Sequence, residues 1–415
     1  MSLFSALTAS VSGMAAQANK LSTVSDNIAN SNTTGYKDAS TEFQDLFNQT
    51  GTTSYNAAGV STVIRYNIAA QGSPKGTSSP TDLAIKGNGF FLVKDSSGAT
   101  YLTRAGNFVQ DSAGNLVNAA GFTLLGYSVA SGKTAADGVS ALLPVNVLGD
   151  GLQAAPSTTG VYRANLNSNA PVATAPLPSA NVATSAYTSK SSLTTYDNLG
   201  NAVTLDIYST KTGTNTWEQS IFNADGAASG GGFPYSAGSL LSTQTLNFSA
   251  ADGSLTSPTT ATVAIPGGKT LTLSLSGTTQ LASPFAVGSA TTDGNAPSAF
   301  KTVSVDADGT VSEVFVSGAT KTIATIPLAT VASVDNLTPT AGDAYQANIQ
   351  SGAILVGDAG LGGFGAIDSS ALEASTVDLA SQLTDMIVAQ RSYESNSKVF
   401  QTGSDLLSTL NNMLK

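Results

Sequence analysis

Large apolar residues recur at every seventh position near the carboxyl-terminal end of the chain. The column consists of Leu372, Leu379, Met386, Tyr393, Phe400, Leu407 and Leu414. Most residues between them are polar, and no proline interrupts the stretch. A sustained seven-residue repeat predicts a long helix with one apolar seam. At 1.5 Å per residue this helix would be roughly 60 Å long, and so long a seam needs a partner helix.

A second amphipathic helix is predicted over residues 1–30. Its apolar positions form one column of Phe4, Val11 and Ala18 and another of Leu7, Met14, Leu21 and Ile28. The two columns are offset by three residues, which is the a/d pattern of a coiled coil. Two interpretations follow: the terminal helices pair within one chain, or they pack against helices of neighbouring subunits in a polymer. The periodicity alone favours the first.

Between the two helices the pattern changes to short apolar runs separated by Gly, Asn and Asp, which predicts β structure. In the segment 31–75 we expect a short amphipathic piece at 43–47, a loop over 51–59 and a strand over 60–70. Residues 270–276 alternate in the manner of a strand with one buried face. Residues 150–190 are rich in Ala, Ser, Thr and Pro, and we interpret them as a crossing between domains.

The predicted fold class is multidomain, with a terminal α-helical coiled coil and two nested all-β domains. The predicted boundaries are 1–30 and 373–415 for an inner helical domain, 31–75 and 359–372 for a connecting segment, 76–155 and 296–358 for an inner β domain, and 156–295 for an outer β domain inserted into it. The chain thus runs outward through the domains and then returns.

Composition excludes several function classes. Charged residues make up 11% of the 415 residues, against roughly 25% in average proteins. The net charge of −10 makes nucleic acid an unfavourable partner. The chain has no cysteine and no histidine, which excludes disulfides, Cys/His zinc sites and Ser-His-Asp triads.

The sequence also bears on location. The first basic residue is Lys20, so the beginning of the chain lacks the basic region of a cleaved signal peptide. No run of about 18 apolar residues occurs, and we therefore expect no membrane insertion. An extracellular protein of this kind would have to be exported without a cleaved signal.

Candidate chemistry is sparse. Asp306-x-Asp308-Gly309 resembles the opening of a calcium loop, but it lacks the third acidic position and the later Glu, so we predict a hairpin turn. Gly87-Asn88-Gly89 is a lone pair of glycines without the rest of a phosphate-binding motif. Asp378 and Asp385 share a helix face, which we interpret as solvated or interfacial. We therefore predict no catalytic, cofactor-binding or metal-binding residues, no cofactor and no enzymatic activity.

Two long motifs resemble the signatures of the bacterial flagellar rod/hook axial family. The first is SDNIANSNTTGYK at residues 25–37, and the second comprises residues 372–379 and 386–393. The signature positions are Asn27, Ile28, Ala29, Asn30, Gly35, Tyr36, Ala389, Gln390 and Arg391. Thr376 occupies a position where the family usually has Asn. Residues 82–91 and 104–108 look like the inner β domain of the same family.

Within this family, the length and the extra domain at 156–295 resemble hook-type members; distal rod members are much shorter. The resemblance implies a structural subunit that polymerises into a curved, flexible tube outside the cell. This tube would be a universal joint that transmits torque from rod to filament. The implied partners are other copies of the chain, a rod protein, the hook cap, hook–filament junction proteins and the flagellar type III export apparatus. We expect the assembly interface at the apolar columns of both helices, excluding Ala18.

Three alternatives remain open from the sequence. A distal rod protein is disfavoured by length. A β-rich extracellular adhesin or shell protein would need a secretion signal and would not need heptads at both ends. A glycan-cleaving enzyme would need two carboxylates in one cleft, and no motif places them.

Overall fold

The computed structural model describes residues 3–47, 57–132, 134–135, 138–149, 151–174 and 176–413. The chain forms two compact units. Unit 1 comprises Met1–Gly149, Thr302–Glu313 and Lys321–Lys415, and unit 2 comprises Asp150–Lys301 and Val314–Thr320. Unit 2 is therefore inserted, in sequence, into unit 1.

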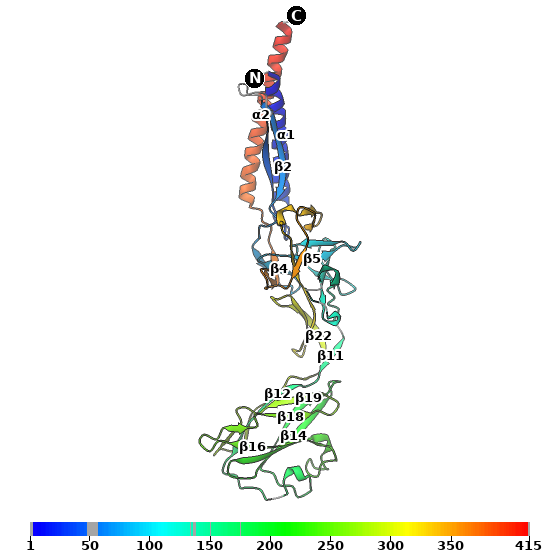
Figure 1. The fold of residues 1–415 in the computed structure, drawn as a ribbon, viewed down its shortest axis with the longest axis vertical. Coiled ribbons are helices and arrows are strands. Elements are labelled where there is room, and N and C mark those ends of the chain that lie inside the picture. Colours follow the sequence, from blue (N-terminus) through cyan, green and yellow to red (C-terminus); the bar gives the residue numbers. More distant parts are fainter. Residues whose placement is uncertain are drawn as a thin grey trace. The chain divides into compact units, whose positions relative to one another are not determined.

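Two long helices of unit 1 lie side by side, α1 (Leu3–Ala29) and α2 (Leu379–Met413) (Figure 1). The predicted helix began too early, at residue 372 or 373, because α2 begins at Leu379. The Asp378 carboxylate accepts the backbone N–H of Ala380 at 2.9 Å and of Ser381 at 3.3 Å, so it caps the helix at this point. Leu372, predicted as the first member of the apolar column, lies instead in the strand β30 (Ala371–Glu373). Leu414 lies outside the described residues.

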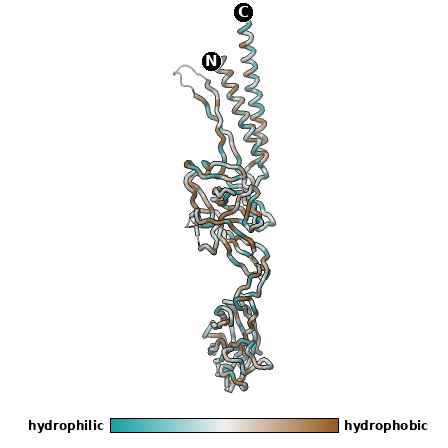
Figure 2. The backbone as a smooth tube through the Cα atoms, turned by 90° about the vertical axis from the view of Figure 1, so that its right-hand side faces the viewer, coloured by the Kyte–Doolittle hydropathy of each residue, from teal (hydrophilic) through white to brown (hydrophobic). Residues whose placement is uncertain are grey.

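The end of α2 runs past the beginning of α1 (Figures 1 and 2). Its last turns therefore have no α1 residues beside them. Among the described residues, neither this helix nor any other combines the length and the apolar character needed to cross a bilayer.

A β-hairpin lies along α1, formed by β1 (Ala39–Phe47) and β2 (Ala57–Tyr66) (Figure 2). The strands pair antiparallel, with Ala39 opposite Tyr66. Asn19 of α1 donates to the Thr62 hydroxyl at 2.8 Å, so polar contacts join the hairpin to the helix. The predicted strand over 60–70 is present as β2, although it ends at Tyr66. The short amphipathic piece predicted at 43–47 is the end of β1, and the pairing of the two in one hairpin was not predicted. The predicted loop at 51–59 falls largely outside the described residues.

The rest of unit 1 is β-rich. Its strands are β3 (Pro74–Gly76), β4 (Leu83–Lys86), β5 (Phe90–Lys94), β6 (Thr100–Thr103), β7 (Val109–Gln110), β8 (Leu116–Val117), β9 (Thr123–Ser128), β10 (Leu143–Pro144), β25 (Leu328–Thr330), β26 (Thr338–Thr340), β27 (Ala344–Gln346), β28 (Leu355–Gly357), β29 (Ala366–Ser369) and β30. Three strands have residues in both units, namely β22 (Asn295–Val305), β23 (Thr310–Phe315) and β24 (Thr320–Thr325).

Strands that are far apart in the sequence pair with one another in unit 1. The central strand β5 pairs with β6, β9 and β25, while β29 pairs with β4 and β30 pairs with β3. Phe90, Leu92, Leu102 and Ala329 are buried together in the core of this region. The returning part of the chain therefore completes the sheets that the outgoing part begins.

Unit 2 is a β-sandwich. Its strands are β11 (Leu152–Ala155), β12 (Thr159–Asn167), β13 (Ser189–Tyr196), β14 (Ala202–Lys211), β15 (Thr216–Asn223), β16 (Leu240–Phe248), β17 (Leu255–Ser257), β18 (Thr260–Ala264), β19 (Thr270–Ser274), β20 (Thr279–Leu281) and β21 (Ala286–Thr292). One sheet has the order β13-β14-β15-β16-β17, and the other contains β18, β19, β12, β20 and β21. Trp217, Leu205, Leu271 and Leu273 are buried between them.

Residues 150–190 do not form a simple crossing, which corrects the prediction. They contain β12, which pairs with β19, β20 and β21. Tyr162, Ala164 and Leu166 of this strand are buried, so a two-residue apolar period is present among the Ser, Thr and Pro residues. The predicted hairpin turn at Asp306–Gly309 is present, because the Gly309 N–H donates to the Asp306 carbonyl at 2.9 Å.

Candidate assembly interface

The seam between α1 and α2 is built from small and polar side chains. Ala389 and Gly403 are the buried residues of α2 within its described part. A Cβ atom added to Gly403 would lie 2.7 Å from Cδ2 of Leu7. The helices approach closely at these positions, because a small residue leaves room for the facing side chain.

Polar contacts at the other end of the helix pair align the two helices. The buried Asn27 donates to the Gln382 side chain at 3.1 Å and to the Ala39 carbonyl at 2.8 Å. The side-chain oxygen Oδ1 of Asn27 accepts the Ala39 N–H at 3.0 Å and the Tyr36 hydroxyl at 3.1 Å. The Asn27 side chain therefore satisfies its hydrogen-bonding capacity through groups from α2, from β1 and from the segment between α1 and β1.

Two further features belong to this region. Lys20 forms an ion pair with Asp385 at 3.0 Å across the seam. Burial and the neighbouring charge of Asp26 raise the pKa of Tyr36 to about 12, so its phenol remains a hydrogen-bond donor over the physiological pH range.

The large apolar column of α2 lies outside this seam. Leu379, Tyr393, Phe400 and Leu407 keep between 38% and 46% of their surface exposed, and Met386 is half-buried. Small residues form the intramolecular seam, so the column is available for contacts beyond the helix pair. The seven-residue spacing puts these residues on one face of α2, and their role as an assembly interface stays a prediction.

The apolar residues of α1 divide into two groups. Phe4 and Val11 are exposed, whereas the second column, Leu7, Met14, Leu21 and Ile28, is half-buried. The pair thus has apolar surface on both helices. Contiguous exposed apolar surface of this kind marks interaction sites.

Sequence reasoning missed a further set of exposed apolar residues on α2. They are Leu383, Ile387, Val388, Val399, Leu406, Leu410 and Met413. Val399 and Leu406 also line a groove of about 390 Å³ with Leu7 and Gly403. These residues are apolar in the sequence, but they do not lie at the seven-residue spacing from which the column was identified.

The two signature motifs meet where the helices end. The Gly35 N–H donates to the Glu373 carbonyl at 2.9 Å, and the Thr376 N–H donates to the Tyr36 carbonyl at 3.2 Å. The Thr376 hydroxyl also donates to the Asp38 carboxylate at 2.9 Å. The unusual Thr at this position therefore makes polar contacts of its own.

The remaining signature residues are distributed over the helix pair. Ala29 is exposed at the end of α1, and the Asn30 side chain donates to the Asp26 carbonyl at 2.9 Å. Gln390 and Arg391 are exposed on α2, next to the buried Ala389.

Comparison with known proteins accounts for almost the whole chain. The family model for the flagella basal body rod protein matches residues 7–37, and that for the flagellar hook protein FlgE/F/G D1 domain matches residues 84–149. The FlaE D2 domain of flagellar basal body proteins matches residues 165–295, and the carboxyl-terminal model of the flagellar basal body rod FlgEFG proteins matches residues 368–413.

Full-length relatives agree with these matches. The chain is 45% identical to the flagellar hook protein FlgE of Rhizobium meliloti over 100% of both chains. It is 34% identical to that of Escherichia coli over 98% of this chain and 100% of the relative. The crystal structure of Helicobacter pylori flagellar hook protein FlgE2 has a similar fold, with a TM-score of 0.50 and 15% identity over 72% of this chain and 100% of that chain. The chain therefore belongs to the flagellar hook protein family, FlgE.

Proposed function

We propose that this structural subunit of the flagellar hook polymerises through its exposed helix faces. The product would be a curved, flexible tube that acts as a universal joint and transmits torque from rod to filament. The observation that carries this proposal is the division of α2 into two faces. Its small residues pack on α1, and its large apolar column remains exposed.

Exposed apolar side chains in this number favour association. Burying one side chain such as Leu or Phe contributes roughly 1.5–3 kcal/mol. The column and the apolar residues of α1 lie on different helices, so one copy can bind its neighbours through two different surfaces. Such heterologous contacts generate open helical filaments when the rotation between copies does not close a ring.

The proposed location is outside the cell, after export without a cleaved signal. The proposed partners besides other copies are the rod protein, the hook cap, the hook–filament junction proteins and the export apparatus. In this proposal the chain has a mechanical role and no catalytic one, and it uses no cofactor or metal.

A distal rod protein is the related alternative. The domain match at residues 165–295 and the full-length hook relatives favour the hook. The match named for the basal body rod alone covers residues 7–37, which is the part that both classes share.

Genetic complementation tests the proposal directly. The full chain is expressed in a related bacterium that lacks its own hook protein, and hooks are counted by electron microscopy. A version lacking residues 379–413 is the matched control. We expect hooks from the full chain and none from the control. Absence of hooks with the full chain, despite its export, would contradict the proposal.

A further inference from the structure

A buried cluster of charges joins three distant parts of unit 1. Glu373 lies just before α2, Lys37 lies between α1 and the hairpin, and Arg104 lies in the β-rich region after β6. The side chains of Lys37 and Glu373 are at most 1% exposed, and that of Arg104 is 5% exposed. Glu373 forms ion pairs with Lys37 and, at 3.0 Å, with Arg104.

The same carboxylate also holds the segment that follows the hairpin. The Gly72 N–H donates to Glu373 at 2.8 Å, and Lys37 donates to the Ala70 carbonyl. Gln71, between these two residues, donates to the Ile85 carbonyl at 2.7 Å and accepts the Gly87 N–H at 3.2 Å. The chain segments that lead into and out of the helical part therefore meet at Glu373.

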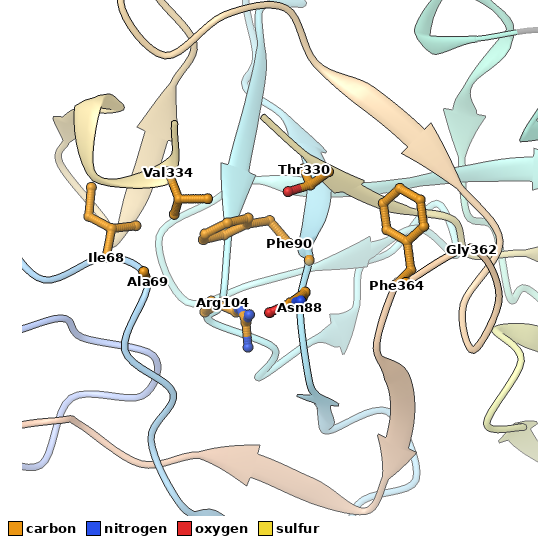
Figure 3. A pocket seen from close by; sticks show the side chains of 11 residues that line it. Ile68, Ala69, Asn88, Phe90, Arg104, Thr330, Val334, Gly362 and Phe364 are labelled. Atoms are coloured by element: carbon orange, nitrogen blue, oxygen red, sulfur yellow. The ribbon is translucent and has the colours of Figure 1, made fainter. Parts of the chain in front are cut away.

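Arg104 anchors this cluster in the β-rich region. Its guanidinium donates to the Gly87 carbonyl at 2.9 Å and lies 5.1 Å from the centre of the Phe90 ring. Figure 3 shows Arg104 beside Phe90 and Asn88, at a cavity of about 290 Å³. The buried guanidinium is therefore held by Glu373, by the Gly87 carbonyl and by the Phe90 ring.

From this arrangement we propose that Lys37, Arg104 and Glu373 form a clamp that couples rotation of the helix pair to the β-rich region of unit 1. The proposal rests on the torque-transmitting function proposed above. Backbone hydrogen bonds such as Gly35 N–H to the Glu373 carbonyl already join the segments near residues 35–38, 70–73 and 373–378 to one another. The buried charges add side-chain contacts that connect these segments to Arg104 in the β-rich region. Removing one partner of a buried ion pair leaves the other charges uncompensated, so the cluster cannot be opened one contact at a time. Burial lowers the pKa of Lys37, while the charge of Glu373 opposes this effect. The positive charge of Lys37 therefore depends on the presence of Glu373.

Glu373→Gln tests the clamp, because it keeps the shape of the side chain and removes its charge. The matched control is Glu42→Gln, which removes the carboxylate of the exposed Arg65–Glu42 pair in the hairpin. Both variants are made in the full chain, and the torsional compliance of assembled hooks is measured on cells with a locked motor. We expect at least a twofold rise in compliance for Glu373→Gln and no change for Glu42→Gln. Equal compliance of Glu373→Gln and the unsubstituted chain would overturn the clamp, and the proposed function would stand because hooks had formed.

Hydrogen exchange of the purified full chain covers the case in which Glu373→Gln forms no hooks. We expect at least tenfold faster amide exchange at residues 67–76 and 371–378, with unchanged exchange in unit 2. Unchanged exchange at both segments would overturn the clamp. Failure of the unsubstituted chain to form hooks would instead overturn the proposed function.

Discussion

Gly13 of α1 faces Asn396 of α2 so closely that a Cβ atom on Gly13 would lie 2.8 Å from Nδ2 of the Asn side chain. This contact belongs to the same seam as Ala389 and Gly403. The two helices therefore approach closely at small residues. Most of the apolar surface of the helix pair is left for contacts with other molecules, which is the basis of the first prediction.

Tyr393→Asp should abolish polymerisation and leave the β regions folded. Tyr393 is in the middle of the exposed apolar column, and its burial against a neighbour would contribute roughly 1.5–3 kcal/mol. A carboxylate at this position would place an unpaired charge in the contact, at a cost of several kcal/mol. The measurements are hook counts by electron microscopy and circular dichroism of the purified chain. Tyr393→Phe should polymerise normally, and normal hooks from Tyr393→Asp would show that the column faces solvent in the assembly.

Gly35→Ala should destabilise unit 1 far more than Gly98→Ala. Both glycines have positive φ, +74° and +90°, and this strain costs an L-residue about 1–2 kcal/mol. A Cβ on Gly35 would also lie 2.7 Å from backbone atoms of Arg104 and Ala105, whereas Gly98 has open space. We expect Gly35→Ala to lower the free energy of unfolding by roughly 3 kcal/mol or more, which is at the upper end of the range for single substitutions. Urea unfolding followed by circular dichroism compares the two, and equal losses would contradict the role assigned to the clash.

Asp206→Asn should destabilise unit 2 at neutral pH but much less in acid. Burial alone would raise the pKa of Asp206, but hydrogen bonds from Lys190, Tyr235 and Ser192 hold the pKa below its usual value. A carboxylate with a lowered folded-state pKa stabilises the fold fully above its unfolded pKa of about 3.9. That contribution is lost as the pH falls from there through the folded-state pKa. We expect a loss of roughly 1.5–3 kcal/mol at pH 7, the value of hydrogen bonds to a charged group.

The measurement for Asp206→Asn uses Trp217. It is the only tryptophan in the sequence and is fully buried in the core of unit 2, so its fluorescence reports the unfolding of this unit. The difference between Asp206→Asn and the unsubstituted chain should shrink below about pH 4. The exposed Asp225→Asn serves as the control. A difference of the same size at pH 7 and pH 3 would contradict the prediction.

Deletion of residues 156–295 should leave unit 1 folded and able to assemble. The cut ends, Ala155 and Ala296, are close, because Ala155 pairs with Asn295, the neighbour of Ala296, between β11 and β22. A short turn can therefore join them. We expect export and hook formation to persist with a changed hook shape. Electron microscopy and secretion assays test this, and a complete loss of secretion would count against it.

The parts of the fold that were predictable are those with a periodic signal. Both helices follow from their heptads, and the alternation over 270–276 predicted β19. The start of α2 was missed because the repeat from Leu372 continues through Asp378, whose capping role has no periodic signature. The pairing of β1 with β2 depends on which segments meet in space, and a short amphipathic stretch does not reveal this.

The candidate site was predictable as a surface but not as a set of contacts. The column around Tyr393 follows from the seven-residue repeat, and its role in assembly stays a prediction. The small-residue seam was not predicted, because Ala389 and Gly403 give no hydropathy signal. Lys37, Arg104 and Glu373 are separated by 67 and 269 residues respectively along the chain. Only the fold brings these charges together, so no local pattern could identify the cluster.

The contacts of Lys20 with Asp385 and of Asn27 with Gln382 also limit how the protein can deform. Sliding α2 by one heptad along α1, about 10 Å, would separate both pairs, and the buried Asn27 amide would lose one of its two acceptors. The two helices therefore resist sliding along each other, and the helix pair keeps a fixed length. In a bent tube, the inner side is shorter than the outer side. This difference in length must then be accommodated by movement between neighbouring copies, while each pair keeps its own alignment.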